Sequence, residues 1–110
     1  MANARLFKKE IKEFLFNQTL HAFDPETLAR VATVQYRPDW SCHVTMADGS
    51  TDDGQYGFEG NFYWTRYKQF RDGALHRFSL NRIDEHTAQA YFENGVRAFL
   101  QSSLTQINSP

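Results

Sequence analysis

Polar and apolar residues alternate along residues 61–83, where aromatic side chains and threonine are frequent. Alternation with a period of two is typical of a strand with one buried face, and these residue types fit a pleated sheet. Asp72-Gly73 interrupts the alternation with a pair that suits both positive-φ positions of a type I′ turn. The pattern therefore predicts a β-hairpin made of residues 61–70 and 74–82.

The turn of this hairpin fixes how its two strands pair, because register follows from the turn residues. With Asp72-Gly73 as the turn, Tyr67 faces Phe78 and Thr65 faces Leu80. One face then carries the expected core residues, which are Tyr63, Thr65, Tyr67, His76, Phe78 and Leu80. The other face is expected at the surface and carries Arg66, Lys68, Arg77, Ser79 and Asn81, with Trp64, Phe62, Phe70, Leu75 and Ile83 around them. A slip of one strand by one residue would exchange its faces, so this surface depends on the turn.

Two other stretches have apolar residues at the spacing of amphipathic helices. Residues 4–17 place Phe7, Ile11, Phe14 and Leu15 on one stripe, with the lysines largely off it. After Asp84, a good N-cap, helical spacing is kept by Ala88, Tyr91, Phe92, Val96, Phe99 and Leu100. Gly95 would cost this second helix about 1 kcal/mol relative to alanine. We expect a helix at both positions, followed by a polar, frayed tail over residues 102–110.

The chain between the first helix and the hairpin has mixed signals. Asp24-Pro25 is typical of a helix start, but residues 25–36 suit a helix and a strand alike. We favour one helical turn followed by a strand. Residues 41–47 alternate and predict another strand. Residues 48–60 are dense in aspartate and glycine, which predicts a loop.

Together these elements predict an α+β fold. It comprises an N-terminal helix, an antiparallel meander sheet of about four strands, and a C-terminal helix packed on one sheet face. A chain of 110 residues is long enough for one domain with a substantial core, and no repeat or linker divides it. A hydrophobic content of 41% argues against disorder. We therefore expect residues 1–110 to form a single domain.

The formal net charge of −1 gives no general attraction to nucleic acid or to a membrane. The charges are unevenly distributed. Between Arg37 and Arg66 there are aspartates and glutamate but no lysine or arginine, whereas Asp72 is the only acidic residue from Arg66 to Arg82. The single cysteine, Cys42, excludes an internal disulfide and suits a reducing compartment. The N-terminus lacks the apolar run of a signal peptide, and no segment is long enough to span a membrane. We expect a cytoplasmic protein, in the host cytoplasm if a virus or mobile element encodes it.

Candidate catalytic and metal-binding groups do not form a specific motif. Cys42 and His43 are neighbours on a predicted strand, so they point to opposite faces, and a buried thiol is expected. Residues between Asp48 and Glu59 match several ligand positions of a calcium-binding loop, but Asp53 stands where that loop needs glycine. No phosphate-binding loop or hydrolase nucleophile elbow is present. We expect no cofactor and no metal, and an enzyme using Cys42 and a histidine is the least favoured hypothesis.

The basic, aromatic-edged face of the hairpin is the best candidate for a binding surface. Aromatic residues and arginine are enriched at binding hot spots, and the chain carries no catalytic signature. The first hypothesis is a non-catalytic protein–protein interaction module, such as a small inhibitor or regulatory protein. The candidate binding residues are Trp64, Arg66, Lys68, Arg77, Asn81 and Phe62.

The same face could bind nucleic acid, with basic side chains on phosphates and Trp64 or Phe62 stacked on a base. The net charge and the absence of an RNP-type pattern argue against this alternative. An ordinary solvated sheet face would have a similar composition. Head-to-tail pairing of the acidic and basic regions would give a homo-oligomer. The sequence does not identify the partner or its class.

Overall fold

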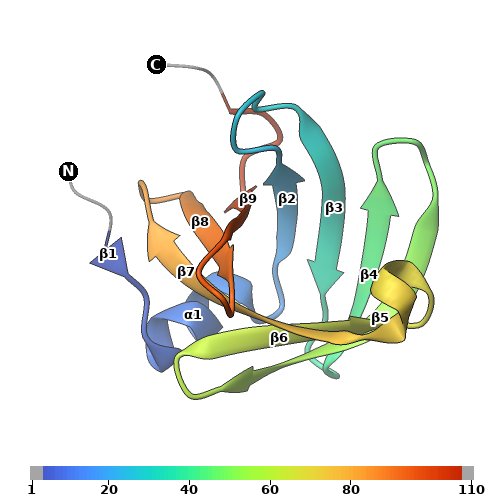
Figure 1. Ribbon diagram of the computed structural model, residues 1–110, viewed down its shortest axis with the longest axis horizontal. Coiled ribbons are helices and arrows are strands. Elements are labelled where there is room, and N and C mark those ends of the chain that lie inside the picture. The colour runs from blue at the N-terminus through green and yellow to red at the C-terminus, as the bar shows by residue number, and fades with distance from the viewer. Residues whose placement is uncertain (1–3, 108–110) are drawn as a thin grey trace.

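The computed structural model describes residues 4–107, and Figure 1 shows how they are arranged. Helical structure is limited to the α-helix α1 (Lys8–Leu15) and the 3₁₀ segment η1 (Phe70–Gly73) within these residues. The strands are β1 (Ala4–Arg5), β2 (Thr19–Phe23), β3 (Arg30–Tyr36), β4 (Ser41–Met46), β5 (Thr51–Glu59), β6 (Phe62–Tyr67), β7 (Leu75–Arg82), β8 (Thr87–Phe92) and β9 (Arg97–Ser102).

Strands β2 to β9 form a closed antiparallel barrel in which each strand pairs with the next. The ring closes where β9 pairs with β2, with Ala22 opposite Gln101. Strand β1 lies outside the ring and pairs with the end of β7 through Ala4 and Arg82. Closure leaves no unpaired edge in the ring, and eight strands enclose an interior wide enough for side chains or one small ligand.

This architecture shows that the predicted α+β fold is wrong. The described residues form a closed eight-stranded barrel with one extra strand and one short α-helix, in place of a four-stranded meander between two helices. The predicted C-terminal helix is instead the hairpin of β8 and β9. Its apolar residues fit a helical stripe, but they are divided between two strands, and both faces of the first half of β8 are buried, at Thr87, Ala88, Gln89 and Ala90. Gly95 has a φ of +88° in the intervening turn, a conformation that glycine adopts readily.

The N-terminal helix is shorter than the predicted residues 4–17. Before it begins, the N–H of Leu6 donates to the carbonyl of Leu80 at 2.8 Å, as in a sheet. After it ends, Asn17 has a left-handed φ of +59°. The predicted apolar stripe is nevertheless present, because Ile11 and Leu15 are fully buried. Helix α1 therefore covers one end of the barrel, near the turn between β5 and β6 (Figure 1).

The strands predicted in the N-terminal half are present. Residues 25–36 contain a turn followed by β3, as favoured above, and β4 corresponds to the strand predicted over residues 41–47. The turn is stabilised by the carboxylate of Asp24, which accepts the N–H groups of Glu26 and Thr27 at 2.8 and 2.9 Å. The loop predicted over residues 48–60 is mostly the strand β5, the longest described strand, because its glycines and aspartates pair with β4 and β6.

The central hairpin has the predicted faces in a different register. Tyr63 lies opposite Phe78, whereas the sequence pattern placed Tyr67 there. The shift is an even number of residues, so every side chain keeps its face. The shift arises because Phe70–Gly73 form the 3₁₀ segment η1, with Arg71 in a left-handed conformation, in place of a two-residue turn.

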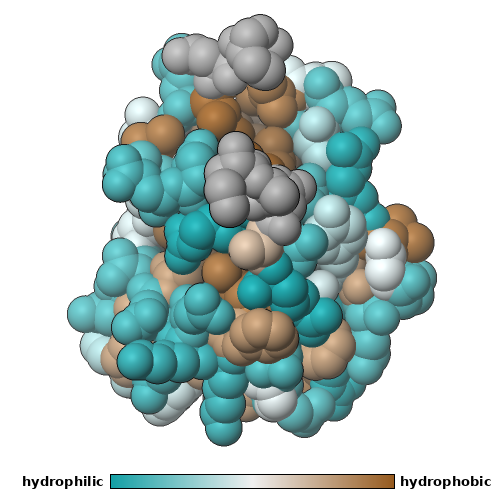
Figure 2. Space-filling view, turned by 90° about the vertical axis from the view of Figure 1, so that its left-hand side faces the viewer, coloured by the Kyte–Doolittle hydropathy of each residue, from teal (hydrophilic) through white to brown (hydrophobic). Residues whose placement is uncertain are grey.

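The core lies inside the barrel and continues under α1. It includes a polar bridge, in which Gln101 accepts a hydrogen bond from the hydroxyl of Tyr36 and donates one to that of Tyr63, both at 2.8 Å. The outer face seen in Figure 2 is mainly hydrophilic, with hydrophobic side chains in small separate groups. No helix of the described residues is long and apolar enough to cross a membrane. Residues 108–110 of the predicted tail lie outside the described residues.

Candidate binding track on the outside of the barrel

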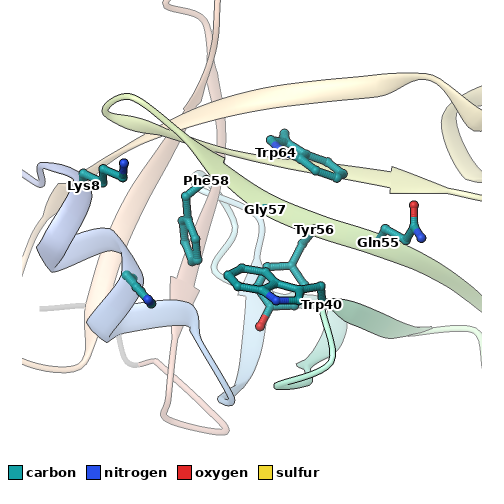
Figure 3. A pocket seen from close by; sticks show the side chains of 8 residues that line it. Lys8, Trp40, Gln55, Tyr56, Gly57, Phe58 and Trp64 are labelled. Atoms are coloured by element: carbon teal, nitrogen blue, oxygen red, sulfur yellow. The ribbon is translucent and has the colours of Figure 1, made fainter.

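A groove of about 480 Å³ crosses the outside of β5 beside helix α1 (Figure 3). It combines side chains from α1, the turn between β3 and β4, and strands β5 and β6. We call it the tryptophan groove, and its lining residues are Lys8, Lys12, Trp40, Gln55, Tyr56, Gly57, Phe58 and Trp64. Figure 3 shows Trp40 and Trp64 on either side of the β5 ribbon, with Lys8 reaching from the helix.

Trp64 forms one wall of the groove and is held by a glycine. It lies opposite Gly57 on the paired strand β5. A Cβ atom on Gly57 would be only 2.7 Å from Cζ2 of the indole, so the ring rests directly on the backbone of β5. An aromatic ring over a strand glycine supplies the packing that the glycine lacks. Trp64 remains half-buried, which leaves part of its ring in the groove.

Trp40 forms the opposite wall and is fixed by other rings. Its ring centroid lies 5.2 Å from that of Phe16, 5.6 Å from Tyr56 and 5.8 Å from Phe58. Tilted and edge-on pairs of this kind are each worth about 0.5–1.5 kcal/mol beyond burial. Trp40 is still 44% exposed, so the cluster presents a positioned indole at the surface.

Helix α1 supplies positive charge to the groove. Lys8 and Lys12 are one turn apart, a spacing that places two side chains on the same side of a helix. The start of α1 is fixed to the barrel, because the N–H of Lys8 donates to Oδ1 of Asn61 at 3.1 Å. Among residues 4–107, no carboxylate lies within 4.0 Å of either lysine ammonium. Both ammonium groups can therefore interact with an anionic partner.

A second hollow of about 540 Å³ continues the groove along β5. Both hollows are lined by Gln55, and the second one, here the basic hollow, also contains Arg37, Arg66 and Lys68. The Nε of Arg66 donates to the carbonyl of Gly73 at 3.1 Å, which orders the guanidinium. We call the groove and hollow together the binding track.

One acidic residue, Asp53, also lines the basic hollow. Its carboxylate Oδ1 lies 2.8 Å from Nδ1 of His43. The three basic residues of the hollow outnumber this single carboxylate, so the hollow is net positive. The track therefore has cations at both ends and two tryptophans near one end.

The structure brings together three of the residues proposed from the sequence, namely Trp64, Arg66 and Lys68. Arg77 is instead engaged by Glu59, with its Nε 2.6 Å from Oε1. The hydrogen bond that Arg77 donates to Glu59, followed by the negative charge of Glu59, raises the pKa of Arg77.

Phe62 and Asn81 also lie away from the track. The guanidinium of Arg5 covers the ring of Phe62, 5.3 Å from its centroid. Asn81 pairs with Arg5 on one side and with Gln89 on the other. A binding role for these two residues and for Arg77 stays a prediction from the sequence.

Sequence reasoning missed Trp40, Arg37, Lys8 and Lys12, which the fold brings to the same track. The spacing of the two lysines shows that they share one side of a helix. Nothing in the sequence shows that this side lies beside Trp64, because the contact depends on closure of the barrel.

Groups considered for catalysis do not assemble in the track. Cys42 is fully buried, as expected, and burial raises the pKa of its thiol to about 11. A raised pKa disfavours the thiolate, which is the reactive form of cysteine. The described residues contain no group of three or more histidine, cysteine, aspartate or glutamate side chains arranged to hold a metal ion.

Comparison of the chain with protein-family models, with curated proteins and with solved structures finds no match.

Proposed function

We propose that this protein is a non-catalytic binding protein whose binding track takes a single strand of nucleic acid. The observation that carries the proposal is the placement of two positioned, part-exposed tryptophans beside Lys8 and Lys12, in a track that continues to the basic hollow. Proteins that bind single strands combine a positively charged groove along the backbone with aromatic rings on which bases stack.

The distribution of charge in three dimensions favours nucleic acid over a protein partner, which the sequence alone had favoured. The net charge of −1 argued against nucleic acid when the chain was considered as a whole. The fold gathers Lys8, Lys12, Arg37, Arg66 and Lys68 along one strand of the barrel. Phosphates would be attracted to this track and repelled by the net negative remainder of the surface. Binding would then be confined to the track.

The first test is a fluorescence titration with single-stranded oligothymidylate. The chain has two tryptophans and both line the groove, so intrinsic emission reports directly on its occupancy. We expect quenching at low salt and a steep loss of affinity as salt is added, with a slope of about −0.7 per contacted phosphate. An emission spectrum that does not respond at low salt would exclude this function.

A matched pair of lysine variants tests the track itself. Lys12→Gln removes one positive charge from the groove, and Lys9→Gln removes one from the same helix outside it. We expect the first variant to lose affinity and to reduce the salt slope by about 0.7. The second should match the wild type, and equal effects of both would show that binding is not in the groove.

Stacking is tested by Trp64→Ala, with the remaining Trp40 as the fluorophore. Loss of one base–aromatic stack weakens binding by about 1–3 kcal/mol, or roughly 5- to 150-fold. Phe7→Ala is the control, because Phe7 is an aromatic residue that is 56% exposed and lies outside the groove. A Trp64→Ala protein that folds and binds as the wild type does would contradict the stacking role.

A protein partner with an acidic segment is the second candidate. Exposed tryptophan beside arginine is also the composition of protein–protein hot spots, and Trp64 and Arg66 both lie on the track. Capture from the native source that survives nuclease treatment and is lost in the Trp64→Ala/Arg66→Ala double variant would favour it. A reducing, cytoplasmic location also stays a proposal, supported by the buried and unpaired Cys42.

A further inference from the structure

The interior of the barrel contains a cavity of about 200 Å³ below segment η1, at the end opposite α1. Small side chains of β2, β3 and β4 line one side, including Ala22, Ala32 and Val44. The rings of Phe78 and Phe99 line the other. Large side chains usually fill the interior of an eight-stranded barrel. Alanine and valine at these inward positions leave room for a small molecule.

The cavity wall includes a buried hydroxyl without a protein partner. Thr65 is 3% exposed, and its Oγ1 forms no hydrogen bond within the described residues. By contrast, the hydroxyls of Tyr36 and Tyr63, which also line the cavity, are both bonded to Gln101. Buried polar groups are nearly always paired, and a threonine hydroxyl can donate or accept. Thr65 therefore offers a polar anchor to an occupant of the cavity.

Arg71 provides positive charge at the mouth of the cavity. Its guanidinium lies over the ring of Phe78, 5.3 Å from the centroid. Within residues 4–107, no carboxylate lies within 4.0 Å of this group. Burial raises the pKa of Tyr63 and of Tyr67, and the charge of Arg71 opposes that rise in both. The field of Arg71 therefore reaches the cavity wall.

The position of Arg71 is fixed by the segment that carries it. Arg71 has φ 58° and ψ 34°, a left-handed conformation that is uncommon for a residue other than glycine. The carboxylate of Asp52 accepts the N–H groups of Gln69 and Phe70 at 2.8 and 3.0 Å. The bond from Phe70, followed by that from Gln69, lowers the pKa of Asp52, so the carboxylate stays charged and holds the segment. Strained residues of this kind persist where neighbouring contacts determine them, often at ligand sites.

We propose that the cavity binds a small organic acid with a compact aromatic body, its carboxylate at Arg71 and a polar substituent at Thr65. A cavity of about 150 Å³ accommodates benzene, so about 200 Å³ allows a ring with short substituents. Arginine pairs strongly with carboxylates, and an apolar wall with few polar groups is typical of small-molecule sites. This site is independent of the binding track outside the barrel.

The test uses 4-hydroxyphenylacetate as the probe and 4-hydroxyphenylacetamide as its neutral counterpart. Methyl resonances of Ala32, Val34 and Val44 report on the cavity wall. We expect the acid to shift these resonances and the amide to bind at least about tenfold more weakly, since it lacks the charge that pairs with arginine. Tryptophan emission should not change, because both tryptophans lie in the outer groove.

Three variants locate the two anchors. Arg71→Gln should abolish the preference for the acid over the amide, while Arg97→Gln, at an exposed arginine outside both the cavity and the track, should retain it. Thr65→Val keeps the shape of the side chain, and should remove the advantage of the hydroxylated acid over phenylacetate. Arg71 is exposed, so its variant is expected to fold even where a core variant does not. Unshifted methyl resonances at millimolar probe, or an acid preference that survives in Arg71→Gln, would overturn the proposal.

Discussion

Strand β5 offers a controlled test of how the barrel is packed, because two of its glycines face opposite sides. Gly57 faces outward, where an added Cβ meets the indole of Trp64 at 2.7 Å. Gly54 faces inward, where an added Cβ meets backbone: it would lie 2.9 Å from Cα of Tyr67, and the carbonyl oxygen of Arg66 is closer still. The same substitution, glycine to alanine, therefore meets a movable side chain at one site and a fixed strand at the other.

The expected magnitudes differ accordingly. In Gly57→Ala the indole must leave its preferred position, which costs about 0.5–1.5 kcal/mol. Reduced freedom of the unfolded chain offsets about 0.4–1 kcal/mol of this, so the net change in the free energy of unfolding is within about 1 kcal/mol. In Gly54→Ala, strands β5 and β6 must separate by about 0.5 Å to bring the contact with Tyr67 from 2.9 to 3.4 Å, and by more to relieve the closer contact with the carbonyl oxygen of Arg66. Overpacking and weakened ladder hydrogen bonds should then cost about 2–4 kcal/mol.

Urea denaturation followed by circular dichroism measures both changes without relying on tryptophan emission. A loss of about 2–4 kcal/mol is a large part of the about 5–15 kcal/mol that stabilises a typical domain, so Gly54→Ala should unfold at a much lower urea concentration. Gly57→Ala should unfold near the wild-type midpoint but show altered tryptophan emission and weaker oligothymidylate binding. Equal destabilisation by the two substitutions, or a larger effect at Gly57, would refute this account of the packing of β5 on β6.

Three further predictions concern other parts of the barrel. Gln101→Leu leaves buried tyrosine hydroxyls without their amide partner and should lower the free energy of unfolding by about 1–3 kcal/mol; an unchanged urea midpoint would contradict the role of this bridge. The folded pKa of Asp52 lies below its ordinary value of 3.8, so its stabilising contribution is present above that value and is lost as the pH falls through the folded pKa. The amide NMR resonances of Gln69 and Phe70 should titrate with Asp52 and lose this step in Asp52→Asn, and persistence of the step would assign it to another group. Cys42 should resist a thiol-specific disulfide reagent at mildly alkaline pH in the native protein and react on unfolding, because burial raises its pKa to about 11; equal rates in both states would show that the thiol is accessible.

The central hairpin shows what alternation along the chain determines. Five of the six residues expected on the core face are buried, although the register differs from the predicted one; they are Tyr63, Thr65, Tyr67, Phe78 and Leu80. The sixth, His76, is only partly buried. Alternation assigns a side chain to a face and is insensitive to an even shift in pairing. The register itself depends on the geometry of η1. Asp72 and Gly73 have the positive φ angles that the sequence predicts, but Arg71 before them is also left-handed, which is uncommon for arginine.

The candidate site was predictable only in part. The aromatic and basic character of the outer face of β6 is visible in the sequence, and it led to Trp64, Arg66 and Lys68. The rest of the track comes from α1 and from the turn between β3 and β4, which no local pattern connects to β6. The cavity is a product of closure as well, since Thr65 and Arg71 face Ala22 and Ala32 only once the strands form a ring.

The sequence by itself determined which residues of the central strands turn inward, the apolar stripe of α1 and the burial of Cys42. These features follow from local periodicity and from the low solubility of apolar side chains in water. Only the tertiary structure decided that Thr87–Phe92 and Arg97–Ser102 are strands, because their apolar residues fit a helix and a sheet alike. Pairing of β8 with β7 and of β9 with β2 satisfies the backbone of both strands and closes the barrel. Local composition cannot predict a strand pairing between residues about eighty positions apart. In this protein such pairings close the barrel, and closure in turn forms the binding track and the cavity.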